Sequence, residues 1–250
     1  MGQKVAVITG AARGIGLATA RLMQAEGWQV GMWDRDRPAL MAAVAGIPDA
    51  FALPYDVSDP DEVARAFADL RSTKGRLDAL VNNAGVAEFG PIEETGFDMW
   101  RRVMATNLDG VFLCSQAAIP LLRASRGAIV NIASISGLRA STLRVAYGTS
   151  KAAVMQLTMQ QAAELGEYGI RANCVAPGPV RTKLAMAVHT QEIIDAYHDA
   201  LPLNRYGSEA EIAEAIGFLC SEKASFITGQ VLAADGGFQS TGVGLPALRR

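Results

Sequence analysis

The sequence predicts an α/β fold in which a parallel sheet is covered by helices on both faces. Short apolar runs of strand length alternate along the chain with longer segments of helical periodicity. The first apolar run ends in a glycine-rich turn that opens a helix. Strands separated by helices pair in parallel, and the crossover helices cover both faces of the sheet.

Seven segments have the length and apolar character of buried strands. They are Val5–Thr9, Gln29–Trp33, 50–57, Ala79–Asn82, Ala128–Ile132, 172–176 and Val231–Ala234. The third contains Pro54, which we place at an irregular end because proline cannot donate a ladder hydrogen bond. Parallel sheets bind ligands at the carboxyl ends of their strands. Functional residues are therefore expected directly after strands.

Helical patterns fill most of the intervals between these strands. They cover 14–27, 58–74, 99–124, Val145–Leu165 and Glu209–Cys220. The second begins Ser-Asp-Pro-Asp-Glu, which has polar caps, an early proline and acidic residues in the first turn. No linker, repeat or low-complexity segment divides the chain, so we expect a single domain over residues 1–250.

Composition and charge argue against several functional classes. The formal net charge is −2, and Lys and Arg are scattered rather than gathered into a basic stripe, so neither nucleic acid nor an anionic membrane is expected as a partner. No apolar run reaches the ~20 residues that span a bilayer. The first strand begins at Val5, which leaves no room for a signal peptide, and we expect a cytoplasmic protein.

Cysteines and histidines do not indicate a disulfide framework or a metal site. Cys114, Cys174 and Cys220 are an odd number at wide spacing without a C-x-x-C pair, so buried thiols are expected. His189 and His198 are surface or substrate-pocket residues rather than metal ligands, because no acid-rich ligand pattern surrounds them. No metal is predicted.

The glycine-rich turn after the first strand is a candidate dinucleotide site. It reads Thr-Gly-Ala-Ala-Arg-Gly-Ile-Gly and contains Gly10, Arg13, Gly14, Ile15 and Gly16. Glycines let the backbone approach a pyrophosphate, and the helix N-terminus offers it N–H groups and a positive dipole end. Such a turn also occurs without any nucleotide. The order strand, glycine turn, helix and strand favours the binding function.

Asp34 closes the second strand about twenty residues after the glycines. A carboxylate there can accept hydrogen bonds from both adenosine ribose hydroxyls and would repel a 2′-phosphate, which favours NAD over NADP. Two alternatives remain open. In one, Asp34 is an ordinary solvated acid in Asp-Arg-Asp-Arg; in the other, Arg13 or Arg35 meets a phosphate.

Tyr147 and Lys151 stand four residues apart at the start of a helical pattern, which places both side chains on one face. A free tyrosine has a pKa near 10, too high for an efficient base at neutral pH, and a nearby ammonium lowers it. Ser134 lies just past a strand end, where its hydroxyl can hold a substrate oxygen beside the tyrosine. Taken alone, the tyrosine–lysine spacing is also typical of a surface pair.

Taken together, these motifs resemble those of the short-chain dehydrogenase/reductase family over nearly the whole chain. The similarity rests on motifs in a fixed order: Thr9-Gly10-x-x-x-Gly14-Ile15-Gly16, Asn82-Asn83-Ala84-Gly85, the set Asn107, Ser134, Tyr147 and Lys151, Pro177-Gly178, and Asp235-Gly236-Gly237. The resemblance implies that Tyr147 is the general acid/base, that Lys151 lowers its pKa and binds the nicotinamide ribose, and that Ser134 positions the reacting oxygen. Asn107 would hold a water molecule in a proton relay.

The resemblance also implies a set of cofactor contacts. Asp56 would contact adenine, with backbone contacts from its neighbour Val57, and Thr182 would reach the nicotinamide carboxamide. Further contacts are expected from Asn83, Ala84, Gly85, Pro177, Gly178 and Val180. Two of these residues also have a structural alternative to cofactor binding. Asn83 could instead stabilise the central strand, and Asp56 could instead be a turn residue.

We therefore predict a Rossmann-like, doubly wound α/β domain with a seven-stranded parallel sheet in the order 3-2-1-4-5-6-7. It would act as an NAD-dependent oxidoreductase on a secondary alcohol or ketone, such as a polyol or sugar, a hydroxysteroid or a 3-oxoacyl group. The family implies a homotetramer or dimer. The irregular stretch 182–205 would be the substrate loop, and the tail 242–250 would reach a neighbouring subunit. The alternative is a non-catalytic dinucleotide-binding sensor or scaffold.

Overall fold

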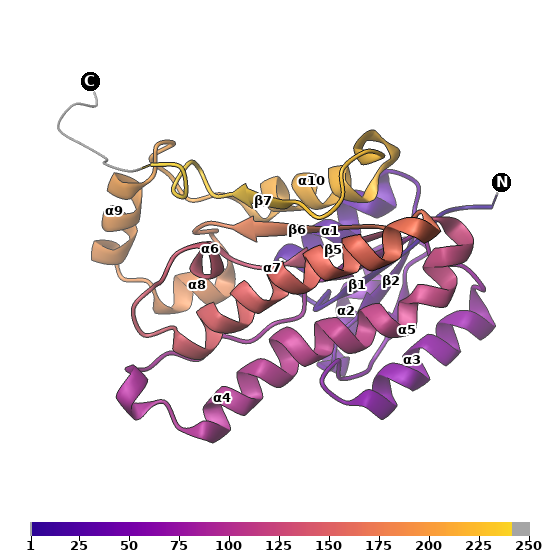
Figure 1. Ribbon diagram of the computed structural model, residues 1–250, viewed down its shortest axis with the longest axis horizontal. Coiled ribbons are helices and arrows are strands. Elements are labelled where there is room, and N and C mark those ends of the chain that lie inside the picture. Colours follow the sequence, from indigo (N-terminus) through magenta and orange to yellow (C-terminus); the bar gives the residue numbers. More distant parts are fainter. Residues whose placement is uncertain (1, 242–250) are drawn as a thin grey trace.

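The computed structural model describes residues 2–241 and contains a sheet of seven strands (Figure 1). All six neighbouring pairs are parallel. The order β3-β2-β1-β4-β5-β6-β7 confirms the predicted topology. The strands are β1 (Val5–Thr9), β2 (Gln29–Trp33), β3 (Phe51–Leu53), β4 (Ala79–Asn82), β5 (Ala128–Ile132), β6 (Arg171–Pro177) and β7 (Val231–Ala234).

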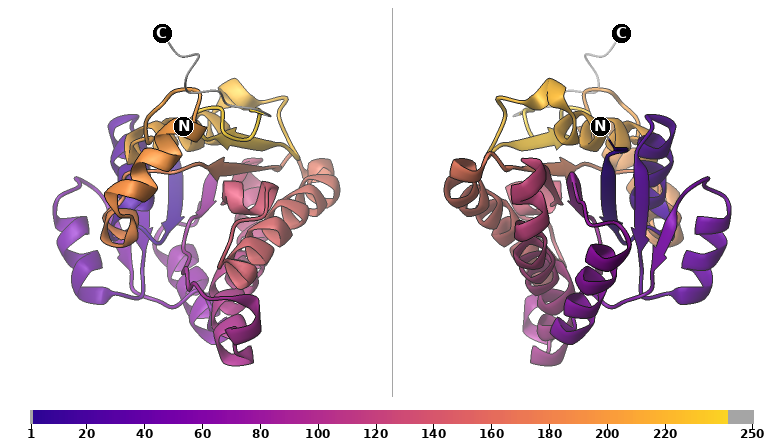
Figure 2. Two further views of the ribbon diagram at one scale, coloured as in Figure 1. Left: turned by 90° about the vertical axis from the view of Figure 1, so that its left-hand side faces the viewer. Right: turned by 90° about the vertical axis from the view of Figure 1, so that its right-hand side faces the viewer.

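The helices form a layer on each face of the sheet, as the two side views in Figure 2 show. One layer packs Met23, Leu40 and Ile216 into a core with alternate strand residues, and the other packs Phe67 and Leu122. The helices are α1 (Gly14–Ala25), α2 (Arg37–Ala45), α3 (Pro60–Thr73), α4 (Phe97–Met104), α5 (Gly110–Ser125), α6 (Ile135–Leu138), α7 (Val145–Leu165), α8 (Lys183–Val188), α9 (Gln191–Ala200) and α10 (Glu209–Cys220).

Local sequence explains where the central elements begin. All five residues of β1 and of β5 are buried, as expected for strands covered on both faces. The Asp59 carboxylate accepts hydrogen bonds from two backbone N–H groups of the first turn of α3, where Pro60 occupies the first helical position. Ser208 and Glu211 form a capping box at the start of α10.

Two predictions about the helices were wrong. The stretch 182–205 is not irregular, because α8 and α9 lie within it. Thr182 caps α8 by accepting from the Ala185 N–H, and Thr190 caps α9 by accepting from the Ile193 N–H. The sequence also indicated no helix after β2, yet Asp36 caps α2 there.

For a third helix, the sequence predicted the extent correctly but did not predict that the helix is interrupted. Instead of one helix over 99–124, α4 and α5 are joined by a π-helical segment, Ala105–Asp109. Single π turns inside helices are frequent at functional sites. The buried cysteines were predicted correctly: Cys114, Cys174 and Cys220 are free, buried thiols.

The carboxyl ends of the strands face the side of the molecule where α6, α8 and α9 lie, on the left in Figure 1. Within residues 2–241, no helix has both the length and the apolar character required to cross a bilayer. The predicted subunit-contacting tail, 242–250, lies outside the described residues.

Candidate active site

Two adjoining cavities open at the carboxyl edge of the sheet. The first, of about 250 Å³, lies between β5, α7 and the segment that leads into α8. The second, of about 390 Å³, lies over the glycine-rich turn and the ends of β2 and β3. Ile15, Asn83, Gly85, Val86 and Thr182 line both cavities, so the two form one continuous site.

The second cavity collects most of the predicted cofactor residues. Those that line it are Gly10, Arg13, Gly14, Ile15, Asp34, Arg35, Asp56, Val57, Asn83, Ala84, Gly85 and Thr182. They follow the ends of five strands that are distant in sequence: β1, β2, β3, β4 and β6. The topology brings them together because all strands are parallel and their carboxyl ends share one edge.

The glycines of the turn have distinct steric reasons. Gly10 has a φ of +64°, and a Cβ on it would lie 2.9 Å from the Ala84 Cα. A Cβ on Gly16 would lie 2.3 Å from the Gly10 carbonyl oxygen and 2.6 Å from the Asn83 Nδ2. Gly16 is outside the described lining of both cavities. Its lack of a side chain instead lets the start of α1 pack closely against the Gly10 carbonyl and Asn83.

The N-terminus of α1 has the properties of an anion site. Arg13 is its N-cap residue and provides no capping hydrogen bond, and the first turn contains no acidic side chain. The first N–H groups of a helix have no acceptor within the helix, so here they are available to a ligand. Together with the close approach that Gly10 allows, this turn fits a dinucleotide pyrophosphate.

Asp34 is held at the end of β2 by two backbone groups. Its carboxylate accepts hydrogen bonds from the Ala12 N–H at 3.2 Å and from the Asp36 N–H at 3.0 Å. The side chain is thus fixed beside the glycine turn and lines the second cavity. It is not a freely solvated acid.

The two arginines that could meet a phosphate both pair with carboxylates. Arg13 forms an ion pair with Asp36, and Arg35 lies 3.2 Å from the Asp56 carboxylate. Burial raises the pKa of Asp56, but hydrogen bonds from Ser58 and Arg35 outweigh this effect and leave that pKa below its usual value. Asp56 also accepts from the Ser58 N–H at 2.9 Å, so the predicted alternative of a turn residue describes part of its role.

Asn83 likewise has a structural contact of the kind predicted as an alternative. Its Nδ2 donates to the Thr9 carbonyl at 3.0 Å and to the Gly10 carbonyl at 3.2 Å. These bonds tie the end of β4 to the glycine turn. Asn83 therefore shapes the wall between the two cavities while also lining both.

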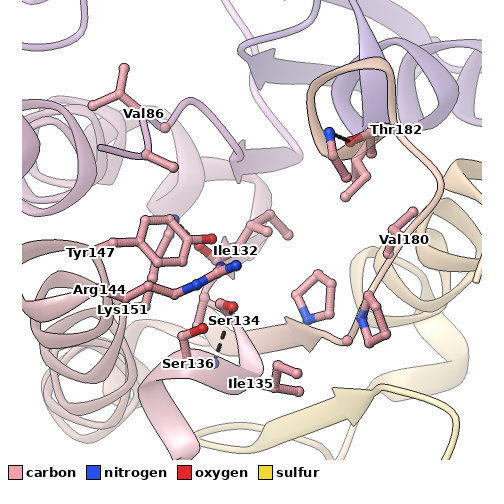
Figure 3. Close-up of a pocket in the computed structure, with 18 of the residues that line it drawn as sticks. Val86, Ile132, Ser134, Ile135, Ser136, Arg144, Tyr147, Lys151, Val180 and Thr182 are labelled. Atoms are coloured by element: carbon pink, nitrogen blue, oxygen red, sulfur yellow. Dashed lines mark hydrogen bonds between the residues drawn. The ribbon is translucent and has the colours of Figure 1, made fainter. Parts of the chain in front are cut away.

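Ser134, Tyr147 and Lys151 line the first cavity, and Figure 3 shows the tyrosine and serine hydroxyls facing it from opposite elements. Ser134 follows β5 and caps α6 by accepting from the Ser136 N–H at 3.1 Å. Burial raises the pKa of Tyr147, whereas a hydrogen bond from Ser134 and the positive charge of Arg144 lower it. The serine and the tyrosine are thus close enough to act on one substrate oxygen.

Lys151 is buried against the end of β5. Its Nζ donates to the Ile132 carbonyl at 2.7 Å and lies 5.9 Å from the centroid of the Tyr147 ring. Burial lowers the pKa of Lys151 to about 8. Arg144 is a further cation near the tyrosine, and its charge lowers the pKa of Tyr147.

Asn107 lies behind the cavity wall, fully buried in the π-helical segment. Its Oδ1 accepts from the Val86 N–H at 2.8 Å, while its Nδ2 donates to the Val86 carbonyl at 2.9 Å and to the Ser150 hydroxyl at 3.1 Å. A Cβ on Gly85 would lie 3.3 Å from the Asn107 Oδ1 and 3.5 Å from the Lys151 Nζ. Asn107 therefore lies next to Lys151, across Gly85.

The remaining residues predicted to contact the cofactor line the first cavity, and several lining residues were missed. Pro177, Gly178, Val180 and Thr182 line the first cavity. The sequence did not indicate a further group of lining residues: Phe89 and Arg144 in the first cavity, and Tyr55, Thr106 and Glu209 in the second. Tyr197 in the first cavity and Lys183 in the second belong to the predicted substrate loop 182–205. The one signal for Arg144 is its position one helical turn before Tyr147, which does not fix the direction of its side chain.

Comparison with known protein families gives a match over most of the chain. Residues 10–239 match the family model described as enoyl-(acyl carrier protein) reductase. The chain is 40% identical to meso-2,3-butanediol dehydrogenase of Serratia marcescens over 236 residues, which is 94% of each protein. It is 37% identical over 245 residues to 2-(S)-hydroxypropyl-CoM dehydrogenase 3 of Xanthobacter autotrophicus, covering 94% of this chain and 96% of that protein.

Two further similarities extend this result. The chain is 36% identical over 241 residues to a 3-oxoacyl-[acyl-carrier-protein] reductase of Chlamydia muridarum, covering 94% and 96% of the two proteins. A crystal structure described as a gluconate dehydrogenase from Agrobacterium tumefaciens superposes with a TM-score of 0.92 at 31% identity, covering 96% of this chain and 97% of that one. The shared architecture extends over the whole described fold.

Proposed function

The chain belongs to the short-chain dehydrogenase/reductase family, and from this premise we propose that it is an NAD-dependent oxidoreductase that interconverts a secondary alcohol and a ketone. Family members act on CH–OH groups with NAD or NADP. The names of two relatives denote a butanediol and a hydroxypropyl compound, both of which contain a secondary alcohol. A polyol or sugar, a hydroxysteroid and a 3-oxoacyl group all satisfy this reaction.

One observation carries the proposal. The cavity lined by Ser134, Tyr147 and Lys151 is continuous with the cavity lined by Gly10 and Asp34. A dinucleotide that lies across both would have its pyrophosphate at the uncapped N-terminus of α1. Its nicotinamide end would then lie in the cavity that contains the tyrosine.

When bound, the nicotinamide exchanges a hydride with the carbinol carbon of the substrate. The chain itself handles the proton on the oxygen. In the oxidation direction, the Tyr147 phenolate accepts that proton, and in reduction the phenol returns it. Ser134 donates a hydrogen bond to the same oxygen and fixes its distance from the tyrosine.

Lys151 and Asn107 supply the surroundings of this proton transfer. Lys151 binds the ribose hydroxyls next to the nicotinamide. Since burial already lowers its pKa to about 8, it can also pass a proton on near neutral pH. Asn107, across Gly85 from Lys151, holds the water molecule that continues the relay.

The preference for NAD rests on the charges around the second cavity. Asp34 is fixed there as a hydrogen-bond acceptor for ribose hydroxyls, and its negative charge opposes a 2′-phosphate. Arg13 and Arg35 would be the cations for such a phosphate, but both are paired with carboxylates. Asp56 and Val57 would contact the adenine, and Thr182 the carboxamide.

The proposal extends to organisation and location. We take residues 1–250 as one domain and expect a cytoplasmic homotetramer or dimer. Two large exposed hydrophobic side chains, Phe112 on α5 and Met159 on α7, support association through these helices.

A panel of secondary alcohols and ketones assayed with NAD and with NADP tests the proposal. Turnover of at least one alcohol with NAD, at a higher kcat/KM than with NADP, is the expected result. Binding of NADH without turnover of any panel member would instead favour the non-catalytic sensor or scaffold. That alternative gives no reason for a serine and a tyrosine hydroxyl to share one cavity.

A further inference from the structure

The first cavity is positively charged. Its lining contains Arg144 and Lys151, and neither Asp nor Glu is among the described residues that line it. The walls are otherwise largely apolar, including Val86, Phe89, Ile135, Val180 and Val188. A buried or half-buried charge is costly without a partner. The chemistry of this cavity therefore favours a negatively charged ligand group.

Arg144 is the cation that faces the substrate side. It is the N-cap residue of α7, and its guanidinium packs 4.7 Å from the centroid of the Phe89 ring. Figure 3 shows it beside the Tyr147 hydroxyl and directed into the cavity. Its charge lowers the pKa of Tyr147 and adds to the lowering of the His189 pKa that burial causes, so it acts on both sides of the space between them.

The protein itself does not neutralise this arginine. None of the ion pairs between described residues includes Arg144. Lys151 is less suited than Arg144 to bind an anion, because its Nζ donates a hydrogen bond to the Ile132 carbonyl and burial lowers its pKa to about 8. A guanidinium remains charged at all working pH values and binds carboxylates through two parallel hydrogen bonds.

The size of the cavity limits the ligand. About 250 Å³ must accept the nicotinamide ring as well as the substrate, whereas typical pockets for drug-sized ligands measure roughly 300–1,000 Å³. A compact molecule with a short chain between the reacting carbon and its charged group fits this space. A large ring system or a long acyl chain would extend out of it.

We propose that the substrate is a small hydroxycarboxylate and its oxo acid, with the carboxylate bound by Arg144 while the reacting oxygen lies between Ser134 and Tyr147. This inference rests on the proposed function and specifies its substrate class. It also makes Arg144 the residue that distinguishes charged from neutral alcohols.

The test compares each short 2-, 3- and 4-hydroxy acid with its own neutral primary amide. For the wild-type protein, we expect kcat/KM for the best acid to exceed that for its amide by about tenfold or more, as hydrogen bonds to a charged group predict. Arg144→Gln should reduce this ratio by roughly the same factor, and Arg144→Lys by less, since it retains the charge. Because the ratio is taken within each variant, a general loss of active protein cancels.

A matched control and a second readout complete the design. Arg71 is exposed in the last turn of α3, at the opposite edge of the sheet, and Arg71→Gln should leave the ratio unchanged. Binding of the oxo acid to the enzyme–NADH complex, followed by NADH fluorescence, reports on Arg144 without any turnover. The dissociation constant should rise about tenfold or more in Arg144→Gln.

The outcomes separate this inference from the proposed function. Turnover of acid and amide at equal kcat/KM would overturn the inference and leave the oxidoreductase proposal in place, as would an unchanged ratio in Arg144→Gln. A preference for matched hydroxysulfonates over hydroxy acids would overturn the proposal that the group bound by Arg144 is a carboxylate. Arg144-dependent binding of oxo acids without turnover of any alcohol would support the inference and contradict the proposed reaction. Neither binding nor turnover would overturn both.

Discussion

Arg144 and Tyr147 stand one helical turn apart at the start of α7, and the arginine charge lowers the pKa of the tyrosine against the effect of burial. This relationship predicts a pH effect. Removing the charge in Arg144→Gln should raise the pKa of Tyr147, because a nearby cation favours the phenolate. Alcohol oxidation needs the phenolate, so kcat/KM rises with pH through this pKa, and the rising limb should move to higher pH in the variant. A pH profile identical to that of the wild type would contradict the electrostatic coupling.

Tyr147→Phe removes the proposed acid/base hydroxyl and little else. We expect kcat to fall by about 10²–10⁴-fold, the usual contribution of general acid–base catalysis. NADH affinity, measured by fluorescence titration, should stay within a few-fold of wild type. Tyr168→Phe is a suitable control, since Tyr168 lies outside the site and packs against Arg123. Substantial activity in Tyr147→Phe would remove this residue from its proposed role.

Asp34→Asn tests the cofactor preference. The substitution removes the negative charge and keeps an acceptor oxygen for only one of the two backbone N–H groups that hold this side chain, because these groups bond different carboxylate oxygens. The ratio of kcat/KM with NAD to that with NADP should fall by roughly tenfold or more, because a charge-assisted hydrogen bond is lost and the repulsion of a 2′-phosphate disappears. Steady-state kinetics with both cofactors measure this ratio. A wild-type preference for NADP would already contradict the interpretation of Asp34.

Gly14 and Gly16 predict different responses to alanine. Gly14 has a φ of +61° but open space around it, with Glu209 Oε1 at 3.8 Å from an added Cβ. Gly14→Ala should therefore cost only the left-handed strain, about 1–2 kcal/mol. Gly16→Ala forces atoms into a 2.3 Å contact with a backbone oxygen, so the turn must move. Thermal unfolding without cofactor should show the larger loss for Gly16→Ala, and the reverse order would contradict the packing described.

How much of this molecule could be predicted depended on which physical signal each part carries. Five strands were predicted with their observed bounds, because a strand covered on both faces is a short apolar run between polar turns. Helices α8 and α9 were missed because α8 has only 6 residues and α9 buries none of its residues in the core; their signal was a threonine cap at Thr182 and Thr190. Cap residues also occur in turns, so such a signal is weak alone.

In the candidate site, too, some residues could be predicted from the sequence and others could not. Ser134 and Tyr147 could be placed because the serine follows a recognisable strand and the tyrosine lies at the start of a recognisable helix. Both also match a spaced motif. Arg144 could not be assigned to the cavity, since the direction of a single side chain at a helix start depends on tertiary contacts such as the Phe89 ring. The hydrogen-bond partner of Lys151 could not be predicted for a related reason: spacing places the lysine on one face with Tyr147, but only tertiary contacts bring its ammonium to the Ile132 carbonyl.

Substitution of Asn107 tests whether this residue contributes to the stability of the fold, to catalysis or to both. Its carboxamide bonds both backbone polar groups of Val86 and the Ser150 hydroxyl, all in a buried place. Asn107→Ala leaves buried groups without partners, at about 1–3 kcal/mol for each unsatisfied group. For a chain of this size, each kcal/mol lowers Tm by about 2–4 °C, so a drop of several degrees is expected along with the loss of activity.

Asn82→Ala is the matched control for this experiment, because Asn82 is also a buried asparagine but bonds Ser115 and Asn131 away from the cavity lining. It should lower Tm by a similar amount, and kcat at a temperature well below both Tm values should fall far less than in Asn107→Ala. Equal losses of kcat in the two variants would mean that Asn107 acts only by holding Val86 in place. An unchanged Tm in Asn107→Ala would contradict the hydrogen bonds that define its position.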